Sequence, residues 1–162
     1  MRPVAPDATT RGDVTLFLSG DVMTGRAIDQ VLPVPSDPVL YEPWVRNALD
    51  YVELAERASG RIPDAVEPSY IWGHALRALD AAGPHARIIN LETAVTTSDK
   101  PDPKGINYRM HPSNTPCLTA AGIDCCVLAN NHVMDWGRSG LLETLATLRS
   151  SGMCTEIGRA HV

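Results

Sequence analysis

Three apolar segments of this chain each lead directly into side chains that can bind a metal ion or move a proton. Asp21 follows residues 14–20, Glu92 follows residues 87–91, and Asn131, His132 and Asp135 come shortly after residues 125–129. A buried strand that ends in such groups brings them to the rim of a sheet, where ligand cavities form. Three endings of this kind along one chain predict the first half of a metal site.

The composition predicts one compact domain, since 44% of the 162 residues are hydrophobic and 20% are charged. The net charge of −5 and the lack of a basic cluster argue against nucleic-acid binding. No apolar run reaches the ~20 residues that a membrane helix needs, and residues 1–12 lack the apolar stretch of a secretory signal. We therefore expect a cytoplasmic location, with no membrane segment in this chain.

The four cysteines show no CxxC pairing of the kind that binds metals. Cys125 and Cys126 lie in an apolar strand pattern, where neighbouring side chains point to opposite faces. We interpret them as small hydrophobic residues, which agrees with a reducing compartment.

Apolar periodicity predicts strands that alternate with helices. The expected strands cover residues 14–18, 88–91, 106–110 and 123–128; the expected helices cover residues 22–30, 44–58, 69–82 and 139–151, with a short helix that Asn114 caps and Gly122 ends. The proline-rich segment 31–43 cannot form regular structure. This order indicates an α/β fold whose strands are buried on both faces, with strands 14–18, 88–91 and 123–128 as neighbours in one sheet.

We divide the chain into a leader without regular structure (1–12), one domain (13–155) and a tail (156–162). The last predicted helix ends at Gly152, and a strand should follow it, yet the sequence stops ten residues later. We therefore expect the fold to be incomplete. Residues 157–162 look like a translated sequencing adapter, so His161 is not counted as a ligand.

Several of these segments resemble the bacterial capsule-synthesis family called CapA or PGA_cap. The matching motifs are Gly20-Asp21-Val22-Met23, Asn90-Leu91-Glu92 and Ala129-Asn130-Asn131-His132-x-x-Asp135-x-Gly137. That family is named for poly-gamma-glutamate capsule production and looks like a branch of the calcineurin-like metallophosphoesterases. The resemblance implies an α/β fold that is the N-terminal part of a calcineurin-like metallophosphatase sandwich.

The resemblance also implies roles for individual residues. Asp21 matches the aspartate that binds one metal ion, Glu92 stands where the superfamily has its bridging aspartate, and Asn131 matches the asparagine that binds the second metal. His132 matches the catalytic histidine, and Asp135 would orient it. Oxygen ligands with some imidazole suit Mn, Mg, Fe or Zn, and two such divalent ions are implied for the full-length protein.

Two departures from the family pattern predict that this chain alone is an incomplete and inactive fragment. Met23 stands where classical phosphoesterases carry a histidine ligand after Asp21, and a thioether is a poor ligand for a hard cation. The histidine motifs of the later half are also absent from the sequence.

The expected substrate is a phosphoester or an anionic polymer, acted on by hydrolysis or transfer. The candidates to line its pocket are Arg26, Lys104, Arg109 and His111, although isolated cations in loops are commonly just solvated. The alternative is a non-catalytic module that binds an anionic polymer or helps to assemble an envelope complex.

Overall fold

The computed structural model describes residues 12–158, so most of the predicted leader and residues 159–162 of the predicted tail lie outside the described part. The strands are β1 (Leu16–Val22), β2 (Ala86–Leu91), β3 (Ala94–Val95), β4 (Arg109–Met110), β5 (Cys125–Val127) and β6 (Cys154–Glu156). The helices are α1 (Ala27–Val31), α2 (Ala48–Ser59), α3 (Ala75–Ala82), α4 (Pro116–Ala120) and α5 (Gly137–Ser150), with the 3-10 turns η1 (Tyr70–Trp72) and η2 (Pro112–Asn114).

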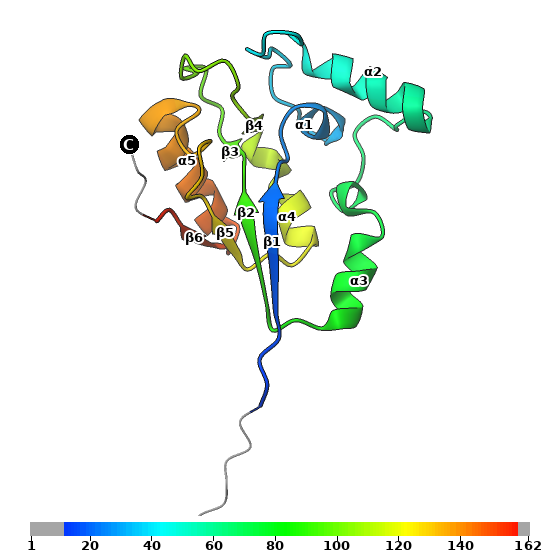
Figure 1. The fold of residues 1–162 in the computed structure, drawn as a ribbon, viewed down its shortest axis with the longest axis vertical. Helices are drawn as coiled ribbons and strands as arrows, with labels where there is room; N and C mark the ends of the chain where they lie inside the picture. Colours follow the sequence, from blue (N-terminus) through cyan, green and yellow to red (C-terminus); the bar gives the residue numbers. More distant parts are fainter. Residues whose placement is uncertain (1–11, 159–162) are drawn as a thin grey trace, which may run out of the picture.

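The centre of the fold is a parallel four-stranded sheet in the order β1-β2-β5-β6 (Figure 1). The three strands predicted to be neighbours are neighbours. β6 supplies the strand that was expected after the last helix, and β3 and β4 form a separate parallel pair. The protein is therefore a mixed α/β structure, as predicted. Within residues 12–158, no helix is long and apolar enough to cross a membrane.

β1 continues further than its apolar pattern predicted, because a bulge carries it past Gly20. The register shifts between Ser19 and Asp21, and Asp21 then pairs with Asn90 of β2. Asp21 therefore lies inside the strand, whereas the sequence predicted that it would follow the strand. The bulge brings its carboxylate beside the end of the neighbouring strand.

Local capping and glycine residues explain why several helices differ from their predicted ranges. α2 begins at Ala48 and not at residue 44, because the side chain of Asn47 accepts a hydrogen bond from the N–H of Leu49 at 2.9 Å. The helix predicted over residues 69–82 is divided at Gly73, which has a φ of 51°. A helix was predicted over residues 22–30, and the helix found there, α1, covers only residues 27–31.

The strand predicted over residues 106–110 is confined to β4, Arg109–Met110. The backbone of the preceding residues bonds elsewhere: the N–H of Tyr108 donates to the carboxylate of Asp135. This departure from a regular ladder is what places Tyr108 in the site described below.

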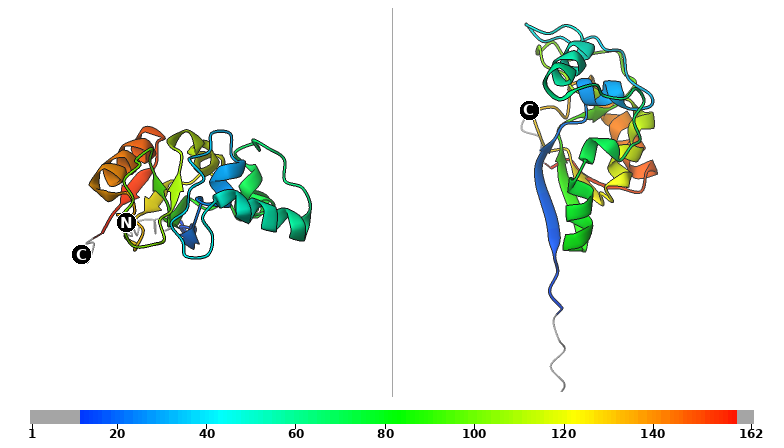
Figure 2. Two further views of the ribbon diagram at one scale, coloured as in Figure 1. Left: turned by 90° about the horizontal axis from the view of Figure 1, so that it is seen from above. Right: turned by 90° about the vertical axis from the view of Figure 1, so that its right-hand side faces the viewer.

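Helices α3, α4 and α5 lie on one side of the central sheet and leave the other side open, contrary to the predicted burial of both faces (Figure 2). Figure 2 shows α3, α4 and α5 on the same side of β1. Ile89 and Cys126 are fully buried on the covered face, whereas Leu16 and Leu18 on the opposite face of β1 are 50% and 66% exposed. Parallel sheets are normally covered on both faces, so this open apolar face is unusual.

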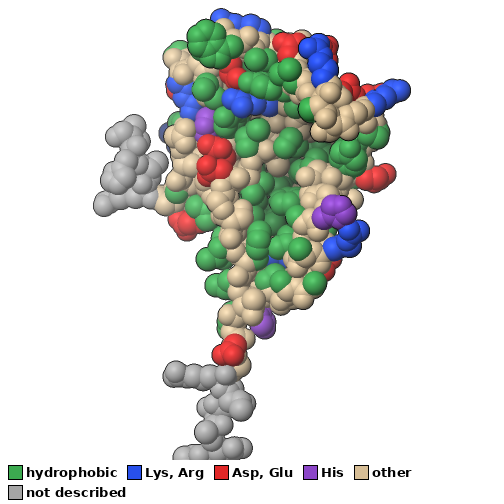
Figure 3. Space-filling view, turned by 45° about the vertical axis from the view of Figure 1, so that its right-hand side comes forward, with side chains coloured by type: hydrophobic (Ala, Val, Ile, Leu, Met, Phe, Trp, Pro, Cys, Tyr) green, Lys and Arg blue, Asp and Glu red, His purple; other side chains and the backbone are tan. Residues whose placement is uncertain are grey.

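A second apolar surface lies between α1, α2 and η1, on the face seen in Figure 3. It is a hollow of about 220 Å³ lined by residues that include Ile28, Val52 and Ile71.

Candidate functional site

The carboxyl ends of β1, β2 and β5 meet at one edge of the sheet, and the predicted site residues lie there. Asp21 is in register with Asn90 on β2, and Asn90 with Val127 on β5. Glu92 directly follows β2, and its N–H donates to the carbonyl oxygen of Val22 at 3.0 Å. The parallel arrangement thus brings together groups that are far apart in the sequence.

A series of hydrogen bonds joins Asp21 to the backbone of His132. The amide Nδ2 of Asn90 donates to Oδ1 of Asp21 at 2.5 Å, and Nδ2 of Asn130 donates both to Oδ1 of Asn90 and to the carbonyl oxygen of Leu91, each at 3.0 Å. The N–H of His132 then donates to Oδ1 of Asn130 at 3.0 Å. These amides fix the loop after β5 against the ends of β1 and β2.

The imidazole of His132 is held between two carboxylates. Its Nδ1 lies 2.8 Å from Oδ2 of Asp135, and its Nε2 lies 3.4 Å from Oε1 of Glu92. The ring of Tyr108 stacks on it, with centroids 4.1 Å apart and planes at 21°. Only 6% of the His132 side chain is exposed. A ring with an orienting carboxylate on one nitrogen and a second carboxylate near the other is arranged to exchange a proton.

Asp135 is fully buried, and its charge is balanced by Lys104. The ammonium of Lys104 pairs with Oδ1 of Asp135, and it also donates to the backbone oxygen of Asn131 at 2.6 Å. The N–H of Tyr108 donates to Oδ2 at 2.6 Å. A buried carboxylate needs partners of this kind to remain charged, so Asp135 serves as a fixed anchor for the His132 ring.

A small cavity of about 250 Å³ opens beside this ring, lined by Lys104, Ile106, Tyr108, Asn131 and His132. Burial raises the pKa of the Tyr108 phenol, against an opposing effect of the Arg26 charge. Its hydroxyl group therefore stays protonated at neutral pH. The cavity offers an ammonium group, a phenol and an imidazole to a bound molecule.

The donors at this sheet edge match a hard or borderline metal ion in type but are too few to enclose one. They are carboxylate, amide and imidazole groups, which suit Mg, Mn or Zn. Within residues 12–158, however, no group of three or more His, Cys, Asp or Glu side chains can hold a metal ion. Met23 directs its sulfur to the N–H of Gly25 in its own loop, at 3.2 Å.

Arg26 lies near the His132 site, but its charge is already paired. Its Nε is 2.6 Å from Oε1 of Glu42, and its guanidinium lies 4.7 Å from the ring centre of Tyr108 and 5.2 Å from that of Tyr51. The stacking and the ion pair fix Arg26 in place beneath Tyr108.

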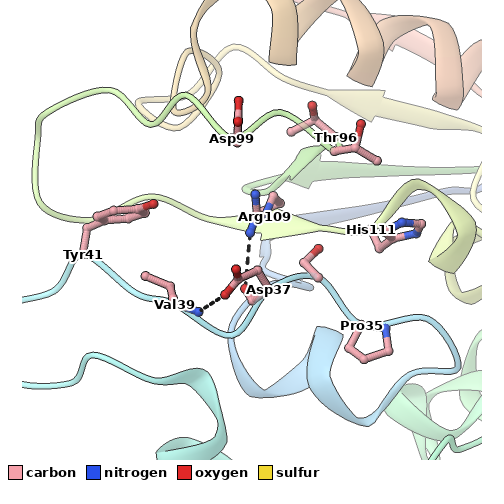
Figure 4. Close-up of a pocket in the computed structure, with 10 residues that line it drawn as sticks. Pro35, Asp37, Val39, Tyr41, Thr96, Asp99, Arg109 and His111 are labelled. Atoms are coloured by element: carbon pink, nitrogen blue, oxygen red, sulfur yellow. Dashed lines mark hydrogen bonds between the residues drawn. The ribbon is translucent and has the colours of Figure 1, made fainter.

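Arg109 and His111 lie together in a different cavity of about 350 Å³, which Figure 4 shows in close-up. The structure therefore divides the predicted site residues between two places. Asp21, Glu92, His132 and Asp135 belong to one connected network, with Asn131 on the rim of its cavity, and Arg109 and His111 belong to the other place.

Sequence reasoning gave no role to Asn90, Asn130 or Tyr108, which make the inner contacts of the network. Asn90 and Glu92 are two positions apart, so they point to the same side of an extended strand, and that spacing was the available signal. Asn130 could not be distinguished from Asn131 in the sequence. In the structure Asn130 faces inward, whereas Asn131 is exposed.

Two comparisons with known proteins, one with family models and one with individual proteins, agree with each other. The family model described as bacterial capsule synthesis protein PGA_cap matches residues 15–158. The chain is also similar to two Mycobacterium tuberculosis proteins described as probable polyglutamine synthesis accessory proteins, Rv0574c of strain ATCC 25618 / H37Rv and MT0602 of strain CDC 1551 / Oshkosh. Each is 48% identical over 141 residues, which cover 86% of this chain and 37% of the relative.

This chain therefore spans little more than a third of the length of these relatives. The family match covers nearly all of the described residues, including both ends of the hydrogen-bonded network. The chain belongs to the bacterial capsule synthesis protein PGA_cap family.

Proposed function

We propose that this chain forms part of the active centre of a capsule-synthesis protein that acts on a phosphoester or another anionic substrate, by hydrolysis or transfer. The observation that carries the proposal is the position of His132, held between Asp135 and Glu92 at the end of a hydrogen-bonded series that begins at Asp21. We also propose that β1, β2 and β5 belong to the N-terminal part of a calcineurin-like metallophosphatase sandwich.

His132 would transfer a proton, and Asp135 would position it. The carboxylate of Asp135 favours a proton on Nδ1, so Nε2 is the nitrogen that exchanges a proton with the oxygen of a substrate. Lys104 pairs with the other carboxylate oxygen of Asp135 and so holds that carboxylate in position for this contact. Lys104, which lines the cavity beside His132, would supply positive charge to a bound anionic group. Arg26 is paired with Glu42, and Arg109 and His111 line the other cavity.

Asp21, Glu92 and Asn131 would hold divalent metal ions (Mn, Mg, Fe or Zn), which when bound supply Lewis acidity toward a phosphoryl oxygen. Because the donors found in residues 12–158 are too few to complete a site, we expect the chain alone to bind metal weakly and to turn over little substrate. The remaining ligands would come from the longer protein.

Calorimetric titration of the 162-residue chain with Mn²⁺ tests the metal residues. We expect weak binding that falls about tenfold or more in Asp21→Asn and in Glu92→Gln. Binding should be unchanged in Asp64→Asn, whose side chain is 96% exposed and pairs with Arg61. Equal affinity in all four proteins would overturn this assignment.

Hydrolysis of bis(p-nitrophenyl) phosphate with Mn²⁺ tests the catalytic role in a longer protein. The M. tuberculosis relative Rv0574c should hydrolyse it, and replacement of the residue aligned with His132 by alanine should lower the rate by about 10²–10⁴-fold. Hydrolysis that persists at the original rate in that variant would exclude His132 as the proton-transfer group.

One observation favours a second candidate, a non-catalytic module that binds an anionic polymer or assembles an envelope complex. It is the incomplete set of metal ligands within residues 12–158. Binding of poly-gamma-glutamate to this chain distinguishes the two functions. If the double variant Asp21→Asn, Glu92→Gln keeps full affinity for poly-gamma-glutamate and the relative shows no hydrolysis, the function is that of the non-catalytic module.

A further inference from the structure

The cavity around Arg109 lies on the opposite side of its segment from the His132 network. Tyr108 and Arg109 are consecutive in extended backbone, so their side chains point to opposite sides. Tyr108 stacks on His132, and Arg109 points into the separate cavity of about 350 Å³, at the centre of the residues drawn in Figure 4.

Arg109 is fixed in this cavity by groups that leave its charge unbalanced. Nη1 donates to the carbonyl oxygen of Ser98 at 2.8 Å and Nη2 to that of Asp37 at 3.3 Å, and the guanidinium lies 4.1 Å from the ring centre of Trp136. No carboxylate within residues 12–158 forms an ion pair with it. Arginine has five N–H donors, so several remain available to a ligand.

Two neighbouring groups add hydrogen-bonding capacity. Nδ1 of His111 accepts a hydrogen bond from the N–H of Ser113 at 3.1 Å, so the proton of the neutral ring is on Nε2, which can donate. Oγ of Ser36 is buried and has no hydrogen-bond partner within the described part of the chain. A buried hydroxyl without a partner is costly, and a ligand in this cavity would provide one.

Two carboxylates, those of Asp37 and Asp99, line the same cavity. Oδ1 of Asp37 accepts a hydrogen bond from the N–H of Val39 at 3.0 Å. With one fixed cation and two anions, the cavity disfavours a molecule of high negative charge. It matches a molecule that carries both signs of charge.

We propose that this cavity binds a small zwitterion of the α-amino acid type, with its carboxylate at Arg109 and its ammonium group at Asp99. The volume is near the lower end of the range for small-molecule sites, ~300–1,000 Å³, and so fits a ligand of this size. The proposal does not depend on the metal or phosphoester chemistry proposed above, and the cavity shares no lining residue with the one beside His132.

Thermal denaturation of the 162-residue chain with each common L-amino acid, followed by calorimetric titration with the one that raises Tm most, tests the proposal. The N-acetylated form of that amino acid lacks the ammonium group, and its amide lacks the carboxylate. Both should bind at least tenfold more weakly. If no amino acid raises Tm, or if the N-acetylated form binds as well as the free amino acid, the proposal is wrong.

Variants then locate the site. Arg109→Gln and Asp99→Asn should each weaken binding about tenfold or more, and Arg138→Gln, an exposed residue that does not line the cavity, should leave it unchanged. Asp99 is exposed and makes no ion pair within residues 12–158, so its variant tests the ligand even if Arg109→Gln fails to fold. Tighter binding of citrate to Asp99→Asn than of any amino acid to the original chain would indicate a simple anion site instead.

Discussion

The side-chain amide of Asn130 donates to Oδ1 of Asn90 at 3.0 Å and so ties the loop after β5 to the end of β2. Asn130→Ala would leave the carbonyl oxygen of Asn90 and the N–H of His132 without their partners. Because unpaired buried groups cost about 1–3 kcal/mol, we expect the free energy of unfolding to fall by about that amount in urea denaturation.

Asn131→Ala is the matched control for this prediction. Its side chain is exposed, and exposed substitutions usually change stability by less than about 0.5 kcal/mol. If the two variants are equally stable, the hydrogen bonds of the Asn130 side chain do not stabilise the protein, and the prediction is wrong.

The sequence was sufficient to predict the neighbouring strands and the meeting of Asp21, Glu92 and His132 at one sheet edge, because apolar runs and parallel topology determine both. It was not sufficient to predict the direction of individual side chains. Which of Asn130 and Asn131 turns inward depends on a loop conformation that consecutive identical residues do not reveal.

Tertiary contacts that involve single buried polar groups were also not predictable from the sequence. Asp29 is 1% exposed, and its carboxylate accepts hydrogen bonds from the N–H groups of Ser36 and His111 and from the side chain of Asn114. These bonds organise the proline-rich loop, yet their partners are up to 85 residues away. The periodicity of apolar residues reports on positions a few residues apart, and it carries no information on hydrogen-bonded pairs that are distant in the sequence.

Gly25 is required where its loop passes the β4 segment. A Cβ atom there would lie 3.0 Å from the backbone oxygen of Arg109 and 3.2 Å from its nitrogen, and the backbone cannot yield easily. We expect Gly25→Ala to lower the free energy of unfolding by about 1–3 kcal/mol. Gly20→Ala, whose Cβ would meet nothing within 4 Å, is the control, and an equal loss in both would contradict this explanation.

Glu143 gives the chain a pH-dependent contribution to stability. Burial alone would raise the pKa of its carboxyl, but hydrogen bonds from Thr96 and Thr97 outweigh burial and lower it below its usual value of 4.5. A lowered folded-state pKa stabilises the protein above the unfolded-state pKa and ceases to do so as pH falls through the folded-state value.

Glu143→Gln should therefore be less stable than the original chain at pH 7, and the difference should shrink as the pH falls below about 4. Urea denaturation at a series of pH values measures it. A difference that is constant with pH would show that the carboxylate charge is not responsible.

The four cysteines should differ in their reactivity toward a thiol reagent. Burial raises the pKa of Cys117 and of Cys126 to about 12, whereas Cys154 is exposed on β6. Reaction requires a thiolate and access. In the native chain Ellman's reagent should therefore modify Cys154 first, then the half-buried Cys125, and the other two only after denaturation. Rapid reaction of Cys117 would contradict the packing of the core.

The open face of the sheet predicts that this chain binds hydrophobic dyes. Leu18 is 66% exposed on that face. Leu18→Lys therefore replaces an exposed apolar side chain with a charged one and changes the packing of the core little. Its free energy of unfolding should change by less than about 0.5 kcal/mol, while the fluorescence of bound 8-anilinonaphthalene-1-sulfonate falls. Leu142→Lys is the control, because Leu142 is 56% exposed on α5, away from the open face, and should leave the fluorescence unchanged. Unfolding of the Leu18→Lys chain would instead mean that this face is covered, by a second copy of the chain, in solution.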